Sequence, residues 1–268
     1  MNSDVWDTLS LYGVKVFGAV EFDESLLPWK TRNRKFIPEN AKSILCCLFP
    51  YYSSALEGRR NISYYACVDD YHNIVGEILD KICVKLGKLY SGNKFAGFVD
   101  NSPINEVEVA VRAGLGVLGK NSLLISDVYG SYVFIGCIVT DLEVLPLSTR
   151  DMFFCVGCNR CAEVCPSGAI VDGRVDRELC LSHITQRKGE FTSHERELIR
   201  QSGIVWGCDI CQQVCPMNVG KVETYIDDFR RNIEKFVDLR NVDYLVKSRA
   251  FGYRGAGVMR RNIEVCGD

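Results

Sequence analysis

The first part of the chain alternates short apolar runs with one long segment of helical periodicity. Residues 14–22 and 43–51 are apolar, rich in residues that favour β-strands, and bounded by polar or proline-bearing stretches. From residue 69 to 89, apolar side chains recur three and four positions apart and share one helical face. They are Ile74, Val75, Ile78, Leu79, Ile82, Cys83 and Leu86. The pattern predicts two strands followed by an amphipathic helix.

Further elements follow up to about residue 145. Strands are predicted at residues 95–99, 122–125 and 132–140, and a helix at residues 103–113, which Gly114 ends. Strands that alternate with helical segments are typical of an α/β layer domain. We therefore predict such a domain over residues 1–148.

The rest of the chain is organised differently. Residues 149–220 have few β-branched runs and contain eight of the fourteen cysteines. Residues 221–268 have a helical pattern and predict a short helical tail. The whole chain is therefore expected to be an α+β protein of three parts, with a cysteine-rich module between the α/β domain and the tail.

The cysteines form two runs with iron–sulfur spacing. The first is Cys155-x2-Cys158-x2-Cys161-x3-Cys165-Pro166, and the second is Cys208-x2-Cys211-x3-Cys215-Pro216. The first spacing is typical of bacterial dicluster ferredoxins, in which the last cysteine ligates the other cluster. Two cubane clusters need eight thiolates and the runs supply seven. Cys180, between the runs, is the natural eighth.

The spacing also predicts how the ligands are shared. A tight loop with cysteines three apart can wrap three corners of a cubane but has no room for the fourth, so that ligand comes from the other run. One 4Fe–4S cluster is assigned to Cys155, Cys158, Cys161 and Cys215, and the other to Cys165, Cys180, Cys208 and Cys211. Two C-x2-C pairs also occur in zinc ribbons, but seven cysteines at these intervals, with both runs ending in Cys-Pro, favour clusters.

Composition sets the broad class. The chain has 268 residues, of which 47% are hydrophobic and 25% charged, and a net charge of −2 that gives no polyanion-binding signature. Its acidic start lacks the features of a signal peptide, and no apolar stretch approaches 18 residues. We expect a cytoplasmic protein without a membrane partner, in which disulfides are disfavoured. The cysteines outside the runs are interpreted as small core residues: Cys46, Cys47, Cys67, Cys83, Cys137 and Cys266.

Residues 247–261 carry five basic side chains and no acidic one, with Phe251 and Tyr253 interleaved. A solvated helix face next to the core explains this bias, and a phosphate-contacting patch for RNA or a cofactor is the alternative.

A second group of chemically informative residues precedes the cysteines. Asp100 ends a predicted strand, where α/β proteins usually place reactive groups, although helix capping ahead of Pro103 is the commoner role of such an aspartate. The run G-x-G-x-x-G from Gly114 to Gly119 follows a helix and precedes a strand. A dinucleotide site needs the opposite order, so a nicotinamide site is rejected.

Together these features resemble the epoxyqueuosine reductase family. The resemblance rests on D-x-x-P-x-x-E from Asp100 to Glu106, A-G-L-G-x-x-G-K-N from Ala113 to Asn121, and the two cysteine runs in this order. Shorter matches lie at residues 65–66, 69–72, 249–251 and 260–262. The resemblance covers roughly residues 40 to 265.

Family membership implies a cobalamin-dependent enzyme with two 4Fe–4S clusters that reduces epoxyqueuosine to queuosine in tRNA. Its partners would be tRNA and an external low-potential electron donor. Asp100 would be the proton donor beside the cobalt, and its pKa would need raising by the dry apolar macrocycle. The resemblance gives the cobalamin contacts as His72, Asp100, Lys120, Asn121, Leu124, Ser126 and Asp209.

The chain also departs from the family pattern. It stops at Asp268, before the helical-repeat extension of typical members, and residues 29–40 replace a longer basic and aromatic segment. Tyr64 stands where the family usually has an arginine. Two alternatives therefore stay open: a corrinoid iron–sulfur reductase with another substrate, and a ferredoxin-type electron carrier without a corrinoid.

Overall fold

A four-stranded antiparallel sheet is the centre of the molecule. The computed structural model describes residues 2–27, 32–146 and 154–267. The strand order is β1-β2-β6-β3, and every neighbouring pair is antiparallel. The strands are β1 (Val16–Glu21), β2 (Ser43–Pro50), β3 (Phe95–Val99) and β6 (Val133–Thr140).

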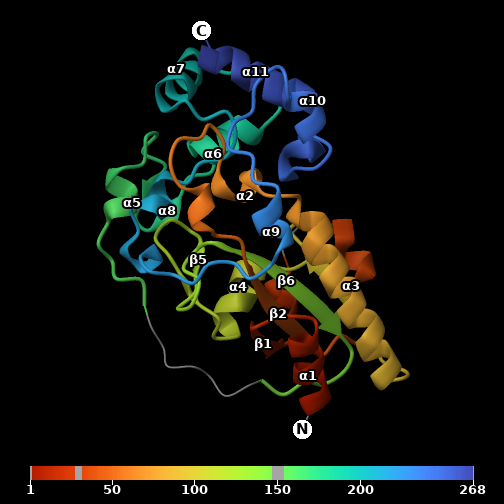
Figure 1. Cartoon of the computed structure of the whole chain (residues 1–268). Coiled ribbons are helices and arrows are strands. Elements are labelled where there is room, and N and C mark those ends of the chain that lie inside the picture. The colour runs from red at the N-terminus through yellow and green to blue at the C-terminus, as the bar shows by residue number, and fades with distance from the viewer. Residues whose placement is uncertain (1, 28–31, 147–153, 268) are drawn as a thin grey trace.

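Helices cover both faces of this sheet (Figure 1). All eight residues of β2 are buried, because its alternate side chains enter two different cores. Leu45 packs with α1 (Ser3–Leu11) and α3 (Tyr71–Leu89), while Ile44 packs with α4 (Glu106–Arg112) on the opposite face. Burial on both faces explains why every residue of β2 after Ser43 is apolar.

The predicted strands at residues 14–22, 43–51, 95–99 and 132–140 and the helix at residues 69–89 are confirmed. Other details differ. The sheet is antiparallel throughout and not of the parallel kind usual in α/β domains, because each strand pairs with its neighbour in the opposite direction. Helix α4 begins after Asn105, whose side chain accepts from the Glu108 amide, so it starts three residues beyond Pro103.

The expected strand at residues 122–125 is only two residues long. It is β5 (Leu124–Ile125), which pairs with β4 (Val117–Leu118) in a small hairpin. In the part of the chain that the structure describes, five 3-10 helices complete the connections: Glu24–Leu26, Arg32–Phe36, Ser54–Leu56, Pro216–Asn218 and Ala250–Arg254.

The cysteine-rich segment consists of short elements on the outside of the sheet domain. They are α5 (Arg160–Glu163), β7 (Ile170–Val171), β8 (Arg174–Val175), α6 (Leu181–Gln186), α7 (Ser193–Ser202) and α8 (Ile210–Gln213). Helix α7 is the most regular, because Thr192 and Glu195 form a capping box at its start and Gly203 ends it at φ +64°.

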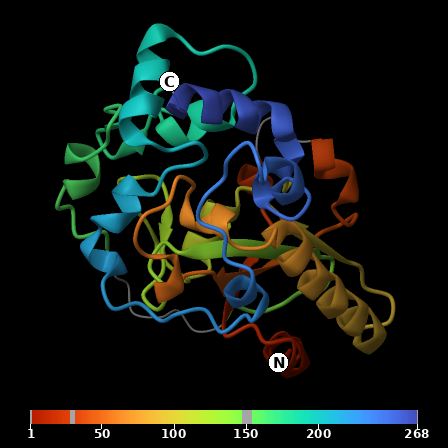
Figure 2. The same ribbon diagram turned by 45° about the horizontal axis from the view of Figure 1, so that its top comes forward.

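The tail is helical only in part. It contains α9 (Asp228–Arg231), α10 (Val242–Leu245) and α11 (Ala256–Gly267), which are separated by irregular segments. Phe229, Phe251 and Met259 join the same core as the sheet and α3. Helix α11 also lies against α7, as both views show (Figures 1 and 2). The predicted boundary at residue 220 therefore does not divide the apolar core.

The basic residues of the tail mostly make internal contacts. Arg249 is buried and pairs with Asp69, and Arg260 pairs with Asp243. Arg261 bonds to the backbone carbonyls of residues 187 and 189 and lies over the ring of Phe191. These contacts favour a structural role over the phosphate-binding alternative. No helix among the described residues combines the length and apolarity that a membrane crossing requires.

Two remote extended segments join the cysteine-rich part to the sheet domain. Ile62 and Trp206 form a parallel bridge, and the Ser63 amide donates to the Trp206 carbonyl at 2.9 Å. Gly207 has φ +69°, and a Cβ there would lie 2.1 Å from the Ser63 hydroxyl oxygen. Only glycine fits this close approach without displacement.

Two glycine substitutions test this junction. Gly203 also has a positive φ, but a Cβ there meets nothing within 4 Å. Gly203→Ala should cost about 1 kcal/mol of folding free energy from the backbone alone. Gly207→Ala should cost about 3 kcal/mol, because overpacking is added. Thermal unfolding of both variants measures the difference, and equal melting temperatures would contradict the close approach at Gly207.

Candidate functional site

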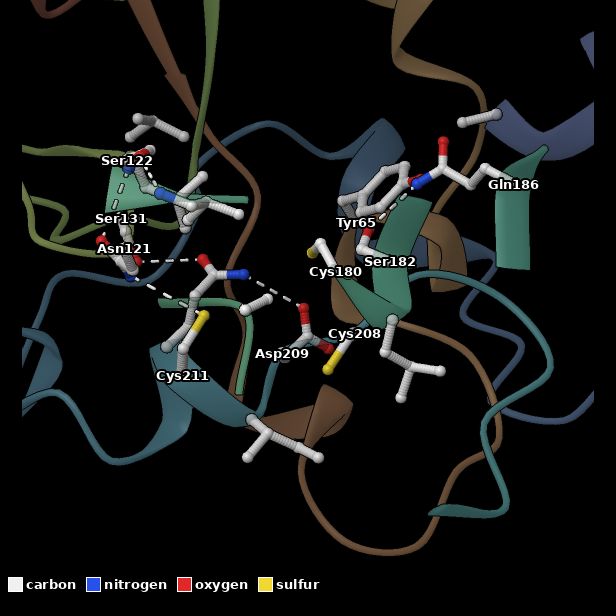
Figure 3. A pocket seen from close by; sticks show the side chains of 18 of the residues that line it. Tyr65, Asn121, Ser122, Ser131, Cys180, Ser182, Gln186, Cys208, Asp209 and Cys211 are labelled. Atoms are coloured by element: carbon white, nitrogen blue, oxygen red, sulfur yellow. Dashed lines mark hydrogen bonds between the residues drawn. The ribbon is translucent and has the colours of Figure 1, made fainter. Parts of the chain in front are cut away.

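A cavity of about 490 Å³ lies where the sheet domain, the cysteine-rich segment and the tail meet. Its walls come from α2 (Tyr64–Cys67), the start of α3, the end of β3, the β4–β5 hairpin and the cysteine runs. Ala250 and Tyr253 line it from the tail. Figure 3 shows Cys180, Cys208 and Cys211 around Asp209 among the residues of this wall.

Asp100 lies in a strained turn at the cavity. It follows β3 directly and has φ +58°, which is uncommon for a residue other than glycine. Two short contacts tighten the turn: the Asn101 amide donates to the Val99 carbonyl at 2.8 Å, and the Ser102 amide donates to the Asp100 carbonyl at 2.7 Å. Strained conformations of this kind concentrate at functional sites.

His72 connects Asp100 with a second carboxylate. Its Nε2 lies 3.1 Å from Oδ2 of Asp100, and its Nδ1 lies 2.6 Å from Oδ1 of Asp70. Asp70 also caps α3 by accepting from the His72 amide. Burial lowers the pKa of His72, but the hydrogen bonds to Asp100 and Asp70 outweigh it and raise the pKa to about 9. The imidazole is therefore protonated at neutral pH and donates from both nitrogens.

The effect on Asp100 is opposite to the sequence-based expectation of a raised pKa. The hydrogen bond from His72 holds the pKa of Asp100 below its usual value, against the effect of partial burial. The Asp100 side chain is 58% exposed, so water in the cavity screens this interaction. The resting state is an ionised Asp100 beside a protonated His72. The proton is stored on the imidazole and not on the carboxyl group.

Glu106 is a third acid near this pair, and its sequence position did not predict a role for it. Burial, and then the charge of Asp100, raise its pKa to about 8. Its Oε1 atom is buried without a hydrogen-bond partner among the described residues. The only sequence signal was its place as the last residue of D-x-x-P-x-x-E.

Four cysteines line the same cavity as His72 and Asp100: Cys165, Cys180, Cys208 and Cys211. They are the set that the sequence assigned to one cluster. The Asn121 side-chain amide lies 3.8 Å from the Cys211 sulfur and can donate to it. The donor set is four thiols in one cavity wall, which fits an iron–sulfur cluster.

The other four cysteines surround a second, smaller cavity: Cys155, Cys158, Cys161 and Cys215. The Lys120 amine bonds at this end, to the Gly157 carbonyl and to the Asn159 side chain at 2.5 Å. All fourteen cysteines lie within the described residues and carry free thiols. No three cysteine, histidine or carboxylate groups of the described part converge closely enough to hold a single metal ion.

Asp209 fixes the second cysteine run to the sheet domain. Its fully buried carboxyl accepts from the Tyr64 amide at 2.7 Å, from Arg60 at 3.2 Å and from Gln212 at 3.2 Å. Burial raises its pKa to about 6, while Tyr64 and Arg60 oppose this rise. The Arg60 guanidinium also lies 3.9 Å from the centre of the Tyr64 ring. Arg60 thus supplies a cation beside Tyr64, a contact that the sequence did not predict.

The predicted cobalamin contacts separate into two groups. His72, Asp100, Asn121 and Asp209 line the large cavity. Leu124 is instead a buried member of the core beneath β2, and the buried Ser126 hydroxyl accepts from the Val128 amide. Lys120 points to the smaller cavity. These three lie outside the described lining of the large cavity, because the hairpin turns their side chains away.

The lining of the large cavity fits a flat apolar cofactor. Tyr65, Tyr71, Phe134 and Leu181 supply ring and aliphatic surface. Polar side chains, among them Asp100, Gln186 and Asp209, are interspersed with them. The volume is in the range usual for cofactor sites. A corrin is compatible with this lining.

Two family models match the chain. The 4Fe-4S double cluster binding domain matches residues 154–218, so the cysteine-rich segment is an iron–sulfur cluster domain. The domain described as Epoxyqueuosine reductase QueG, DUF1730, matches residues 32–101.

Relatives that match most of the chain belong to the same family as the second of these models. An epoxyqueuosine reductase from Lactococcus garvieae is 33% identical over 258 residues, which are 90% of this chain and 71% of the relative. One from Leadbetterella byssophila is 31% identical over 97% of this chain and 84% of its own length.

Solved structures agree as well. The epoxyqueuosine reductase of Streptococcus thermophilus has a TM-score of 0.82 at 26% identity, over 99% of this chain and 80% of that one. A second epoxyqueuosine reductase, solved with an epoxyqueuosine-modified tRNA stem loop, shares the fold at a TM-score of 0.83 and 24% identity over 98% of this chain and 80% of that chain. On this evidence, the chain belongs to the epoxyqueuosine reductase family.

Proposed function

We propose that this protein is a cobalamin- and iron–sulfur-dependent oxidoreductase that reduces the epoxide of epoxyqueuosine in tRNA to queuosine. One observation supports this most directly. A single cavity is lined both by the His72–Asp100 pair and by four cluster-type cysteines. Protons and electrons can therefore reach the same space. A simple electron carrier has no need for such a cavity.

The cysteines would form an electron path toward this cavity. Cys155, Cys158, Cys161 and Cys215 would hold the outer cluster, and Cys165, Cys180, Cys208 and Cys211 the inner one. Cys158 is exposed, so an external low-potential donor can approach the outer site. Cobalamin, when bound in the large cavity, would supply the reductive chemistry at the epoxide.

The chain's own acids would supply the proton. His72 keeps its proton at neutral pH and hydrogen-bonds Asp100, which faces the cavity. The proton would pass from the imidazole to the Asp100 carboxylate and from there to the departing oxygen, which leaves Asp100 ionised and His72 neutral. A Bacillus subtilis relative has an aspartate catalytic loop that can be swung out of the active site, in keeping with a mobile proton donor.

The substrate assignment rests on relatives. A member of the family binds a modified tRNA stem loop. With a net charge of −2, this chain should depend on local contacts more than on overall attraction to phosphate. A cytoplasmic setting, where thiols stay reduced and tRNA is present, suits the cysteines.

Asp100→Asn should lower turnover of epoxyqueuosine-bearing tRNA by about 10²–10⁴-fold, because the side chain can no longer pass on a proton. Iron and cobalt contents should not change. Asp172→Asn is the matched control, since Asp172 is also an exposed aspartate with positive φ (48°) but lies outside the described cavity lining. Single-turnover assays with a chemical reductant measure the effect. Full activity in the Asp100 variant would refute its role.

Cys180→Ala should remove about half of the iron, because only the inner cluster loses a ligand. Cys266→Ala is the control: Cys266 is half-buried against α7 and belongs to neither run. Iron analysis and electron paramagnetic resonance of anaerobically purified protein measure both. Unchanged iron in Cys180→Ala would show that another group is the eighth ligand.

His72 should stabilise the fold most at low pH. Its folded-state pKa, about 9, lies above its ordinary value of 6.5, so the contribution is complete below pH 6.5 and is lost as the pH rises through 9. The melting temperature of His72→Gln should therefore approach that of the unaltered protein between pH 6.5 and 10. His194→Gln, at an exposed position, should change it little at any pH. A constant difference across this range would contradict a raised pKa at His72.

A further inference from the structure

The reaction proposed above consumes more protons than the His72–Asp100 pair holds. Removal of an epoxide oxygen to leave an alkene breaks two C–O bonds, forms a C=C bond, takes up two electrons and two protons, and releases water. The external donor supplies the electrons. The His72–Asp100 pair holds one proton that it can pass to the oxygen, because Asp100 is ionised at rest. A second proton has to come from elsewhere.

We propose that Glu106 holds this second proton and resupplies Asp100 within each turnover. This inference rests on the proposed function. Glu106 is the first residue of α4, directly after the turn that presents Asp100. It does not line the described cavity wall, so it is a positioning and relay residue behind Asp100 and not a group that touches the substrate.

The surroundings of the carboxyl group indicate that it is protonated. Oε1 is buried and has no partner among the described residues. An ionised carboxylate in that position would lose hydration at one oxygen without compensation, which is costly. A carboxylic acid avoids this cost and gains a hydroxyl donor. The residue as a whole is half-buried, but its carboxyl oxygen is enclosed.

The charged and titratable groups that face Glu106 come from three elements. The Asp100 carboxylate, after β3, disfavours a second negative charge, and the protonated His72 of α3 favours it. Tyr71 of α3 and Cys137 of β6 also interact with the carboxyl group, and both are neutral at pH 7, since their ordinary pKa values already lie above 7 and burial and hydrogen bonds raise them further. The Asp100 amide and the Ser102 side chain favour ionisation. Burial and the charge of Asp100 have larger effects than the groups that favour ionisation, so the pKa of Glu106 is raised to about 8.

Proton transfer along this path is balanced. His72 gives its proton to the Asp100 carboxylate, which passes it to the oxygen and returns to its ionised form. After the first transfer the histidine is neutral, and Glu106 gives the second proton to Asp100 and becomes a carboxylate. Water at the exposed side of Asp100 restores both groups after the product leaves.

Glu106→Gln tests the relay, because glutamine keeps the shape and neutrality of the acid but has no transferable proton. Single-turnover reduction at pH 7 should slow at least about tenfold, with iron and cobalt unchanged, and Glu106→Asp should restore part of the rate. Glu108→Gln is the matched control, since Glu108 is on the same helix, is partly exposed and pairs with Arg112. Wild-type rates in Glu106→Gln would overturn the proposal.

A second measurement does not depend on activity. Infrared difference spectra of the purified protein should show the carbonyl band of a protonated carboxyl group that disappears as the pH rises through about 8. The band should persist in Glu108→Gln and be absent in Glu106→Gln. Its absence from the unaltered protein at pH 7 would overturn the proposal even if turnover is normal. If the unaltered protein does not reduce epoxyqueuosine at all, the proposed function fails, and the infrared result still decides whether Glu106 holds a proton.

Discussion

The buried contact of Asp209 with Arg60 and the Tyr64 amide is the constraint on which the cavity depends. It joins a loop with two cluster-type cysteines to the sheet domain across about 145 residues of sequence. An ion pair with so little exposure is costly to break, because one charge would stay buried alone. The adjacent bridge between Ile62 and Trp206 sets the register of the same contact. Without this junction, the cysteines and the acids would not share a cavity.

The acids around His72 depend on each other in a similar way. One imidazole lies between two carboxylates, and a third carboxyl group lies behind them. The surroundings of each group set its protonation state: His72 is protonated, Asp100 is ionised, and the buried Glu106 is protonated. Groups with pKa values pushed in opposite directions are a common basis for acid–base chemistry. The strained turn at Asp100 brings them to the cavity.

Local patterns in the sequence predicted much of the architecture. The strands, the long helix and the composition of the two cysteine groups depend on spacing within short segments, and the structure gathers the cysteines in the predicted groups of four. The antiparallel strand order and the contribution of the tail to the main core depend on contacts between remote segments. For the same reason Arg60 and Glu106 were missed, because their roles come from burial and from partners that spacing does not reveal. Lys120 belongs to the sequence motif but lines the smaller cavity, because a motif position does not determine which cavity a side chain enters.

Two parts of the cavity lining differ in burial: Asp209 is buried beside the cysteines, whereas Asp100 is exposed. Electron transfer between clusters needs the cysteines held by rigid, buried contacts, and Asp209 and its partners provide them. In the proposed reaction, the proton donor has to meet the substrate and then water, and Asp100 is more than half exposed on a short turn. A buried, multiply hydrogen-bonded contact beside the cysteines and an exposed turn at Asp100 thus meet in one cavity. The tail side chains Ala250 and Tyr253 complete the lining, so the apolar core that anchors the tail also shapes the site.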